Sequence, residues 1–307
     1  MQIIMKLKSF FCTALFVAGM LACSAEVPSQ SSSGKAEPAK PVEPVFDEYG
    51  EKDVKFMFNV EARFDDHPLQ AMAIHDNMLF QCYDSGRCRT YDLKSGRHVA
   101  DIFMDCLIAS NHCGNANFGK EYPDGNSMFP ALYVSGDLTN KRCYVMSVNE
   151  LSTVRIQTIN FKLNNEYGGS QVIIDKDRER IVYMQRKNTK IGEKNNCFAI
   201  FEFPLPKLKE KEVTFTDADV LESYDLDTYL PVYQGACIKG GKIYQTYGTG
   251  AKSAGIAIFD LKTHKMERNV SVKNVIPYEP QSVCIYKGKT IMNFGGKGVV
   301  YEIKDID

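Results

Sequence analysis

The sequence predicts an all-β fold, a β-propeller built from four-stranded blades. From Val54 to the C-terminus, short runs rich in Val, Ile, Tyr and Phe alternate with Gly, Asn and Asp turns. Three segments align without gaps, namely Gln70–Ile74, Gln234–Ile238 and Gln281–Ile285. The repeats recur after about 45 to 65 residues, a period typical of propeller blades rather than of solenoids.

Two looser matches bring the number of repeats to five. The same position of the repeat is occupied by Ser170–Ile174 and Asn115–Gly119, which completes a set of five first strands. Second strands are expected at Met78–Tyr83, Ala131–Ser135, Arg180–Gln185, Lys242–Tyr247 and Lys289–Phe294. Third strands are expected at Cys88–Leu93, Cys143–Val148, Cys197–Phe203, Gly255–Leu261 and Gly298–Ile303. Fourth strands follow the first four repeats, at His98–Phe103, Thr153–Phe161, Val213–Thr216 and Met266–Val272.

The fifth repeat ends the chain without a fourth strand. The unassigned N-terminal strand Val54–Ala62 can take that place and close the ring, which leaves no exposed sheet edge. We therefore expect five blades. Six is the alternative, because the long connection Pro204–Tyr233 has room for a degenerate blade. Within that connection, Val220, Leu221 and Tyr224 have helical spacing, so a short surface helix is predicted over Ala218–Leu230.

Residues 1–22 read as a signal peptide. Lys6 and Lys8 precede an uncharged apolar stretch that is too short for a comfortable membrane span, although a transmembrane helix is the alternative. The segment Met20–Cys23 resembles the lipobox of bacterial lipoproteins, in which the cysteine is acylated and becomes the new N-terminus. The resemblance implies lipidation at Cys23 and a place in the bacterial cell envelope, anchored to the outer membrane on its periplasmic or outer face. Ordinary secretion with a free Cys23 is the alternative.

Residues 23–45 read as a tether, and residues 46–307 as the propeller domain. The tether contains four prolines and the run Ser31–Gly34, with almost nothing apolar to bury. The chain has 307 residues with 37 basic and 38 acidic side chains, so losing Lys6 and Lys8 moves the net charge from −1 to about −3. Binding to nucleic acid or to anionic lipid through net charge is therefore not expected.

The repeats resemble the bacterial six-bladed propellers of the NHL and TolB-like kind. The matching motifs are Gln234-Gly235, Gly241-Lys-Ile-Tyr244 and Ile256-Ala-Ile-Phe-Asp260, with Pro280–Val283 as a partial second copy. The resemblance covers residues 54–307. It implies a propeller fold and says little about activity, because propellers share this strand rhythm across unrelated functions.

The candidate site is one mouth of the central channel. Amide side chains recur at or near the starts of the first strands: Gln70, Asn115, Gln171, Gln234 and Gln281. His112 lies beside Cys113 at the lead-in to the second repeat and belongs to the same mouth. A neutral ring of amides suits a polar uncharged ligand, such as a glycan or a peptide backbone, or ordered water. The alternative is that the amides satisfy one another and the backbone at the blade edges.

The expected function is binding of a glycan, a peptide or an envelope partner protein by a monomer, with no metal and no cofactor. None of the first-strand starts is acidic, and no nucleophile elbow, zinc-protease helix, P-loop or calcium loop is present. The alternative is a secreted polysaccharide hydrolase or lyase with its active site in the channel, in which His112 and Tyr122 act as acid or base.

Ten cysteines are present, without a Cys-x-x-Cys pair, so redox, haem and zinc functions are not indicated. Two disulfides are candidates. Cys82 and Cys88 can bridge a hairpin, and Cys106 and Cys113 can close a loop. Cys237 and Cys284 occupy the same blade position, which suggests small buried apolar side chains.

Overall fold

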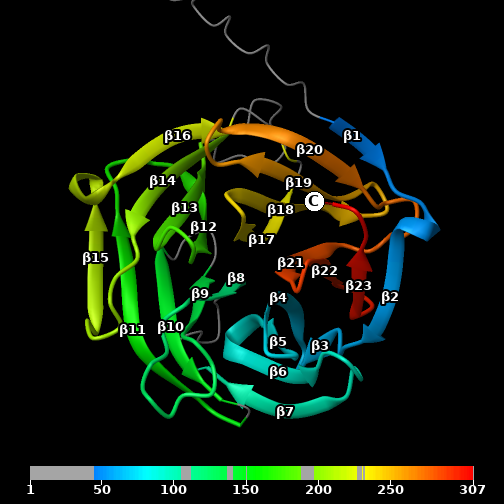
Figure 1. Cartoon of the computed structure of the whole chain (residues 1–307), viewed down its shortest axis with the longest axis horizontal. Helices are drawn as coiled ribbons and strands as arrows, with labels where there is room; N and C mark the ends of the chain where they lie inside the picture. The colour runs from blue at the N-terminus through cyan, green and yellow to red at the C-terminus, as the bar shows by residue number, and fades with distance from the viewer. Residues whose placement is uncertain are drawn as a thin grey trace, which may run out of the picture. The chain divides into compact units, whose positions relative to one another are not determined.

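Five small sheets surround a common centre in the computed structural model of the chain (Figure 1). The structure describes residues 45–104, 112–136, 141–149, 151–187, 197–226, 230 and 232–306. The sheets are the blades of an all-β propeller, so the predicted fold class is confirmed. None of these described residues belongs to a helix that could span a membrane.

The blades follow one another along the chain. Blade 1 contains β3 (Arg63–Phe64), β4 (His67–His75), β5 (Met78–Tyr83), β6 (Arg87–Asp92) and β7 (His98–Phe103). Blade 2 contains β8 (Cys113–Phe118), β9 (Leu132–Gly136), β10 (Arg142–Val148), β11 (Thr153–Lys162) and β15 (Glu212–Thr216). Blade 3 contains β12 (Gly168–Asp175), β13 (Arg180–Arg186), β14 (Phe198–Pro204) and β16 (Glu222–Leu226). Blade 4 contains β17 (Tyr233–Lys239), β18 (Lys242–Gly250), β19 (Ser253–Asp260), β20 (Lys265–Ser271) and β1 (Val45–Glu48). Blade 5 contains β21 (Pro280–Tyr286), β22 (Lys289–Phe294), β23 (Val299–Ile303) and β2 (Val54–Asn59).

The N-terminal strand closes the ring as predicted. β2 pairs with β23, with Val54 opposite Ile303 and Asn59 opposite Val299. A second N-terminal strand was not expected. β1 adds in parallel to the outer edge of blade 4, where the Arg268 Nε donates to Asp47 Oδ2 over 2.7 Å. β1 begins one residue before the expected domain start at 46. Its side chains are mostly exposed, so no pattern of buried apolar residues predicts this strand from the sequence. Backbone pairing with β20 holds it.

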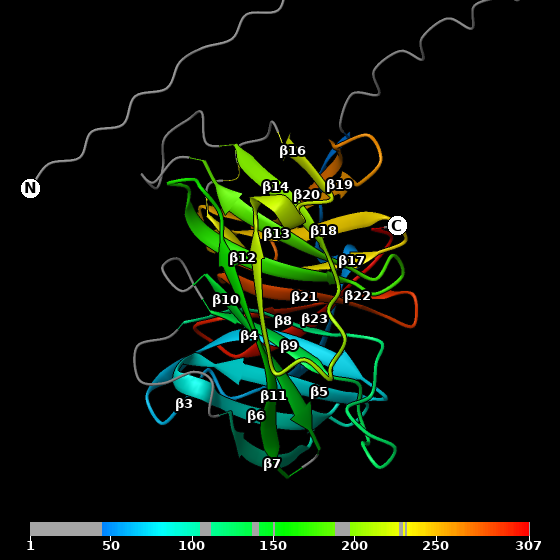
Figure 2. The same cartoon turned by 90° about the vertical axis from the view of Figure 1, so that its left-hand side faces the viewer.

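The connection after β14 differs from the prediction in two ways. The helix predicted over Ala218–Leu230 is wrong: after a 3₁₀ turn at Asp217–Asp219, the chain forms β16, which pairs with β14. The predicted fourth strand at Val213–Thr216 belongs to blade 2 instead, as β15 alongside β11. Figure 2 shows β16 beside β14, with β11 running down the near side. Pairing with β14 provides hydrogen-bond partners for backbone N–H and C=O groups along a whole strand. This outweighs the weak helical spacing of the apolar residues.

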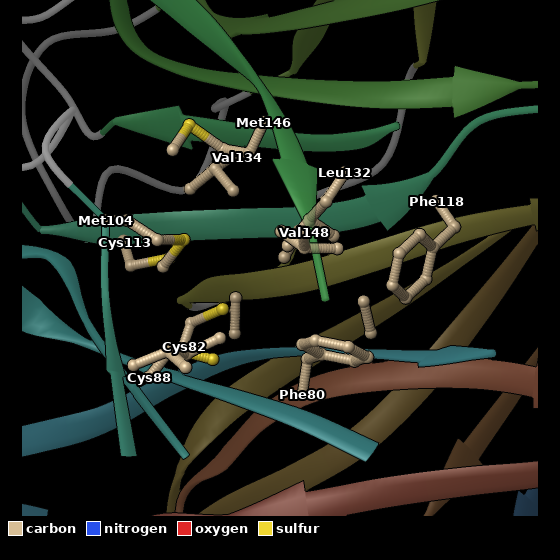
Figure 3. Close-up of a cluster of buried hydrophobic side chains, with 14 of the residues drawn as sticks. Phe80, Cys82, Cys88, Met104, Cys113, Phe118, Leu132, Val134, Met146 and Val148 are labelled. Carbon is tan, nitrogen blue, oxygen red and sulfur yellow. The ribbon is translucent and has the colours of Figure 1, made fainter. Parts of the chain in front are cut away.

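Apolar side chains from neighbouring blades pack together between the sheets. Between blades 1 and 2, Phe80 meets Phe118 and Phe129 edge-on, with ring centroids 5.3 and 5.1 Å apart. Figure 3 shows the rings of Phe80 and Phe118 on the right of the cluster and the sulfur atoms of Cys82, Cys88 and Cys113 on the left.

Three of the four cysteines of the candidate disulfides, Cys82, Cys88 and Cys113, belong to this same core. Cys82 lies opposite Cys88 in the pairing of β5 with β6. Both side chains are buried, as is that of Cys113, and the bridge between Cys82 and Cys88 stays a prediction. Cys106 lies outside the described residues, and its pairing with Cys113 stays a prediction too.

Candidate functional site at the amide mouth

The five innermost strands lie around the centre of the ring (Figure 1). They are β4, β8, β12, β17 and β21, and their last residues line one cavity, so all five begin at the opposite mouth. Each of them carries a shift of register near its start, where one strand has an extra residue. The shifts lie between Leu69 and Met72, Cys113 and Asn115, Gly168 and Ser170, Tyr233 and Ala236, and Pro280 and Ser282. Bulges of this kind re-aim side chains and are common beside functional sites. We call this end of the ring the amide mouth.

The bulges divide the predicted amides into two groups. Gln70, Gln234 and Gln281 lie within bulges, whereas Asn115 and Gln171 lie just after theirs and pair regularly with Ser135 and Met184. Close packing accompanies the bulge of β17, because a Cβ at Gly235 would lie 2.7 Å from Ser282 Oγ. The structure therefore brings all five amides to the inner strands, but only three of them share one backbone setting.

Asn115 joins three blades and is fully buried. Its amide nitrogen donates to the carbonyl oxygens of Val172 in blade 3 and Ala236 in blade 4, over 2.9 and 3.0 Å. The Ala236 N–H donates back to Asn115 Oδ1 over 3.1 Å. Asn117 adds a second bond to the Ala236 carbonyl, over 3.1 Å. Asn115 is thus a structural link between blade edges, as the alternative interpretation of the amide ring proposed, and it ties β8 to β17 across the centre.

A second ring of polar side chains was missed by the sequence analysis. It comes from the second strand of every blade and consists of Gln81, Ser135, Gln185, Gln245 and Asn293, each at most 2% exposed. Gln245 Nε2 and Gln171 Nε2 both donate to the carbonyl oxygen of Gln234, over 2.5 and 2.7 Å. The signal was available in the sequence, since each second strand carries a Gln, Asn or Ser within a largely apolar run.

Several buried polar atoms of these two inner layers lack a hydrogen-bond partner in the described part of the chain. They are Ser135 Oγ, Gln171 Oε1, Gln185 Nε2, Gln245 Oε1, Ser282 Oγ and Asn293 Oδ1. Each such atom costs about 1 to 3 kcal/mol if nothing binds it. Their concentration on the innermost two strands indicates unmet hydrogen-bonding capacity around the centre of the ring, suited to buried water.

Two carboxylates stand beside the amides, which the expectation of a neutral mouth did not include. His112 Nδ1 lies 3.1 Å from Asp84 Oδ1, and that oxygen also accepts the Cys113 N–H over 3.2 Å. Glu279, directly before β21, accepts a 2.6 Å bond from Gln234 Nε2. Burial raises the pKa of Glu279, and the Gln234 bond and the charge of His112 oppose that rise. Asp84 and Glu279 lie just outside the repeated strand segments, so the alignment of repeats did not find them.

The structure separates His112 from Tyr122, the other residue of the enzymatic alternative. His112 precedes β8 and lies at the amide mouth, whereas Tyr122 follows the far end of β8. The Tyr122 hydroxyl lies 3.5 Å from His75 Nε2, beyond the opposite end of the inner strands. Among the described residues, no group of three or more His, Cys, Asp or Glu side chains is placed to hold a metal ion.

Comparison with known proteins shows the fold. No family model and no curated protein matches the sequence. Among solved structures, the chain is similar to the glutaminyl cyclase of Myxococcus xanthus, at 12% identity and a TM-score of 0.54, over 85% of this chain and 98% of that one. A weaker likeness is to BamB of Moraxella catarrhalis, at 8% identity and a TM-score of 0.37, over 78% of this chain and 86% of that one. The described residues therefore form a five-bladed β-propeller whose fold resembles that of the Myxococcus xanthus cyclase.

Proposed function

We propose that this protein is a binding module of the bacterial cell envelope, anchored through an acylated Cys23, that holds a polar ligand at the amide mouth. The ligand is a glycan, a peptide or a surface of a partner protein. The observation that carries the proposal is the half-buried amide of Gln234 at this mouth, which donates to the carboxyl group of Glu279. Such groups favour a ligand that offers both hydrogen-bond donors and acceptors.

The amides that are best placed to meet a ligand are Gln234 and Gln281. Gln234 is half-buried and Gln281 is 8% exposed, whereas Asn115 has no exposure and is used by the backbone of two other blades. Gln234 also connects the amides to Glu279 through its side-chain nitrogen. A ligand at this mouth would therefore meet an amide and a carboxyl group that are already coupled.

The double variant Gln234→Leu, Gln281→Leu tests this proposal. It removes donors and acceptors at the mouth with little change in side-chain volume, so affinity for a ligand found by pull-down should fall, by about 1 to 3 kcal/mol for each lost contact. Gln157→Leu is the matched control, because Gln157 is a buried amide on β11, in the outer part of blade 2. Equal dissociation constants for the double variant and the wild type would place the ligand elsewhere.

A second candidate function is supported by the charged groups of the same mouth. Asp84 orients His112, and Glu279 is held in its protonated form to a higher pH than an ordinary glutamate. A protonated carboxyl within the electrostatic influence of an imidazole can donate a proton to a leaving group, as polysaccharide hydrolases and lyases require.

Glu279→Gln and Asp84→Asn separate binding from catalysis. If the protein is an enzyme, both variants should lose turnover of a polysaccharide but still bind that polysaccharide. If the wild type binds the polysaccharide without shortening it, as measured by the size distribution of the chains, the enzymatic alternative is wrong.

A further inference from the structure

One buried charge of this chain lacks a counter-charge. Three charged side chains are buried among the described residues, namely Asp175, Arg186 and Glu202. Both acids are paired, because Arg178 binds each of them and Arg180 binds Glu202 as well. Arg186 is 8% exposed, and its side chain forms neither a hydrogen bond nor an ion pair with any residue that the structure describes. Burying an unpaired ion costs far more free energy than burying a neutral polar group, so a partner for Arg186 is expected.

Other arginines of the protein show what such a partner is. Five of them pair with carboxylates although their side chains are 19 to 33% exposed: Arg87, Arg89, Arg178, Arg180 and Arg268. Arg186 has less contact with water than any of these and has no carboxylate among the described residues. The partner that it lacks is therefore an anion.

Arg186 lies at the amide mouth, between blades 3 and 4. It ends β13 and pairs with Gly168 at the start of β12. Its side chain is on the same face of β13 as Met184, which packs in the core shared by these two blades. The guanidinium carbon lies 5.4 Å from the centroid of the Tyr233 ring, and Tyr233 directly precedes Gln234.

The contact with Tyr233 compensates the charge only in part. A cation–π contact stabilises the guanidinium but gives its N–H groups no oxygen acceptor. Of the Arg186 nitrogens, only Nε is both sealed from solvent and unpartnered, so the two terminal nitrogens still reach the surface. The neighbouring Lys187 is already paired with Asp225. Arg186 thus presents a planar fork of donors, a geometry that matches a carboxylate.

Gln234 places a hydrogen-bond acceptor next to this fork along the chain. Its Nε2 donates to Glu279, whereas its Oε1 accepts no hydrogen bond from the described residues. The carboxyl groups of Asp84 and Glu279 at the same mouth disfavour an anion with more than one charge. The last residue of a peptide chain has a singly charged carboxylate and, one carbon atom away, an N–H donor, so it matches both groups.

A sugar acid fits the same position less well. Sugar rings bind to proteins by stacking on an open aromatic face. The ring of Tyr233 is in contact with the guanidinium of Arg186 and meets Phe198 edge-on, with centroids 5.1 Å apart. This ring therefore has little open face for a sugar.

We propose that Arg186 binds the terminal carboxylate of a peptide, with Gln234 Oε1 accepting the N–H of the last residue. This inference rests on the proposed function, because it assigns a class to the polar ligand of the amide mouth. That ligand is a peptide with a free C-terminus.

The test titrates the full-length protein with acetyl-glycyl-glycine by calorimetry at constant ionic strength. This probe has no side chains, so it offers only a backbone and a carboxylate. Acetyl-glycyl-glycinamide has the same backbone without the charge and should bind about tenfold more weakly. Arg186→Met removes the guanidinium and keeps an unbranched stem, so it should bring the ratio of the two affinities to about one. Arg97→Met is the matched control on an exposed turn between β6 and β7 and should keep the wild-type ratio.

The melting temperature separates a binding role of Arg186 from a structural one. Without peptide, Arg186→Met should melt no lower than the wild type, because the substitution removes a buried charge that the described residues leave unpaired. A fall of more than about 5 °C would mean that the folded protein itself compensates the guanidinium, and would overturn the proposal.

The remaining outcomes distinguish this proposal from the proposed function. If the acid and the amide bind equally to the wild type, or if Arg186→Met keeps their ratio, Arg186 is not the partner of the carboxylate, and only this proposal is overturned. The same holds if methyl glucuronide binds more tightly than acetyl-glycyl-glycine, or if neither peptide binds up to about 50 mM, well above the millimolar range of weak specific binding. If the double variant Gln234→Leu, Gln281→Leu binds acetyl-glycyl-glycine as the wild type does, both this proposal and the amide mouth as the binding site are wrong.

Discussion

Asn115 provides the sharpest test of how the centre of the propeller is held together. Replacing it with Ala removes three donated bonds, to Val172 O, Ala236 O and Asn117 Oδ1, and one accepted from the Ala236 N–H. The Ala236 carbonyl keeps its bond from Asn117, but its N–H loses its side-chain acceptor in a region with no exposed surface.

The expected loss of stability follows from that inventory. One buried N–H left unpaired costs about 1 to 3 kcal/mol, and the other lost bonds add about 1 kcal/mol each, less what relaxation recovers. We expect a loss of about 3 kcal/mol in the free energy of unfolding. For a domain of this size that corresponds to roughly 6 to 12 °C in melting temperature.

The assay is urea unfolding followed by circular dichroism, with the melting temperature as a second measurement. Asn126→Ala is the matched control, because Asn126 is exposed on a loop and its side chain makes no hydrogen bond with any described residue. A loss below about 1 kcal/mol for Asn115→Ala would refute the argument, since it would mean that the three blades hold their inner strands without this amide.

Three further outcomes are expected. Cys23→Ala should move the protein from the membrane fraction to the soluble fraction, and unchanged fractionation would contradict the lipid anchor. Deleting residues 24–44 should leave the melting temperature unchanged, whereas deleting residues 24–62 removes β1 and β2, exposes an edge of blade 5 and should lower it; equal melting temperatures would contradict closure by β2. Burial raises the pKa of Glu279, so the stability that its protonated form contributes is present below the ordinary glutamate range and is lost as the pH rises through the raised value. Glu279→Gln should therefore be more stable than the wild type at pH 7 and not at pH 4 in urea unfolding, and a constant difference between the two pH values would show that burial of this carboxyl is not the cause.

The blades themselves were largely predictable from the sequence. Alternating apolar residues and Gly or Asn turns determine where a strand begins and ends, and both are local properties of the chain. Ring closure by Val54–Asn59 was predictable for a different reason. The fifth repeat lacks a fourth strand and the N-terminal segment has a strand without a blade, so pairing the two completes the ring.

The exchange of β15 and β16 was not predictable. Both segments have strand-forming residues, but which neighbour each one pairs with depends on where β11 and β14 present a free edge. A free edge is a property of the assembled sheets and leaves no mark in the local sequence. β1 is a still clearer case, since its side chains are mostly exposed and it is held by pairing with β20 and by the bond from Arg268 to Asp47, both of which depend on the folded blades.

The same division applies to the candidate site. The repeats alone place Gln70, Gln234 and Gln281 at one position of the blade, and therefore at one mouth of the ring. What each amide does depends on the assembled blades: Asn115 bonds to the backbone of two other blades, while Gln234 donates to a carboxyl group before the next blade. Hydrogen bonds between residues 45 to 121 positions apart arise from blade packing, and periodicity within one strand carries no information about them.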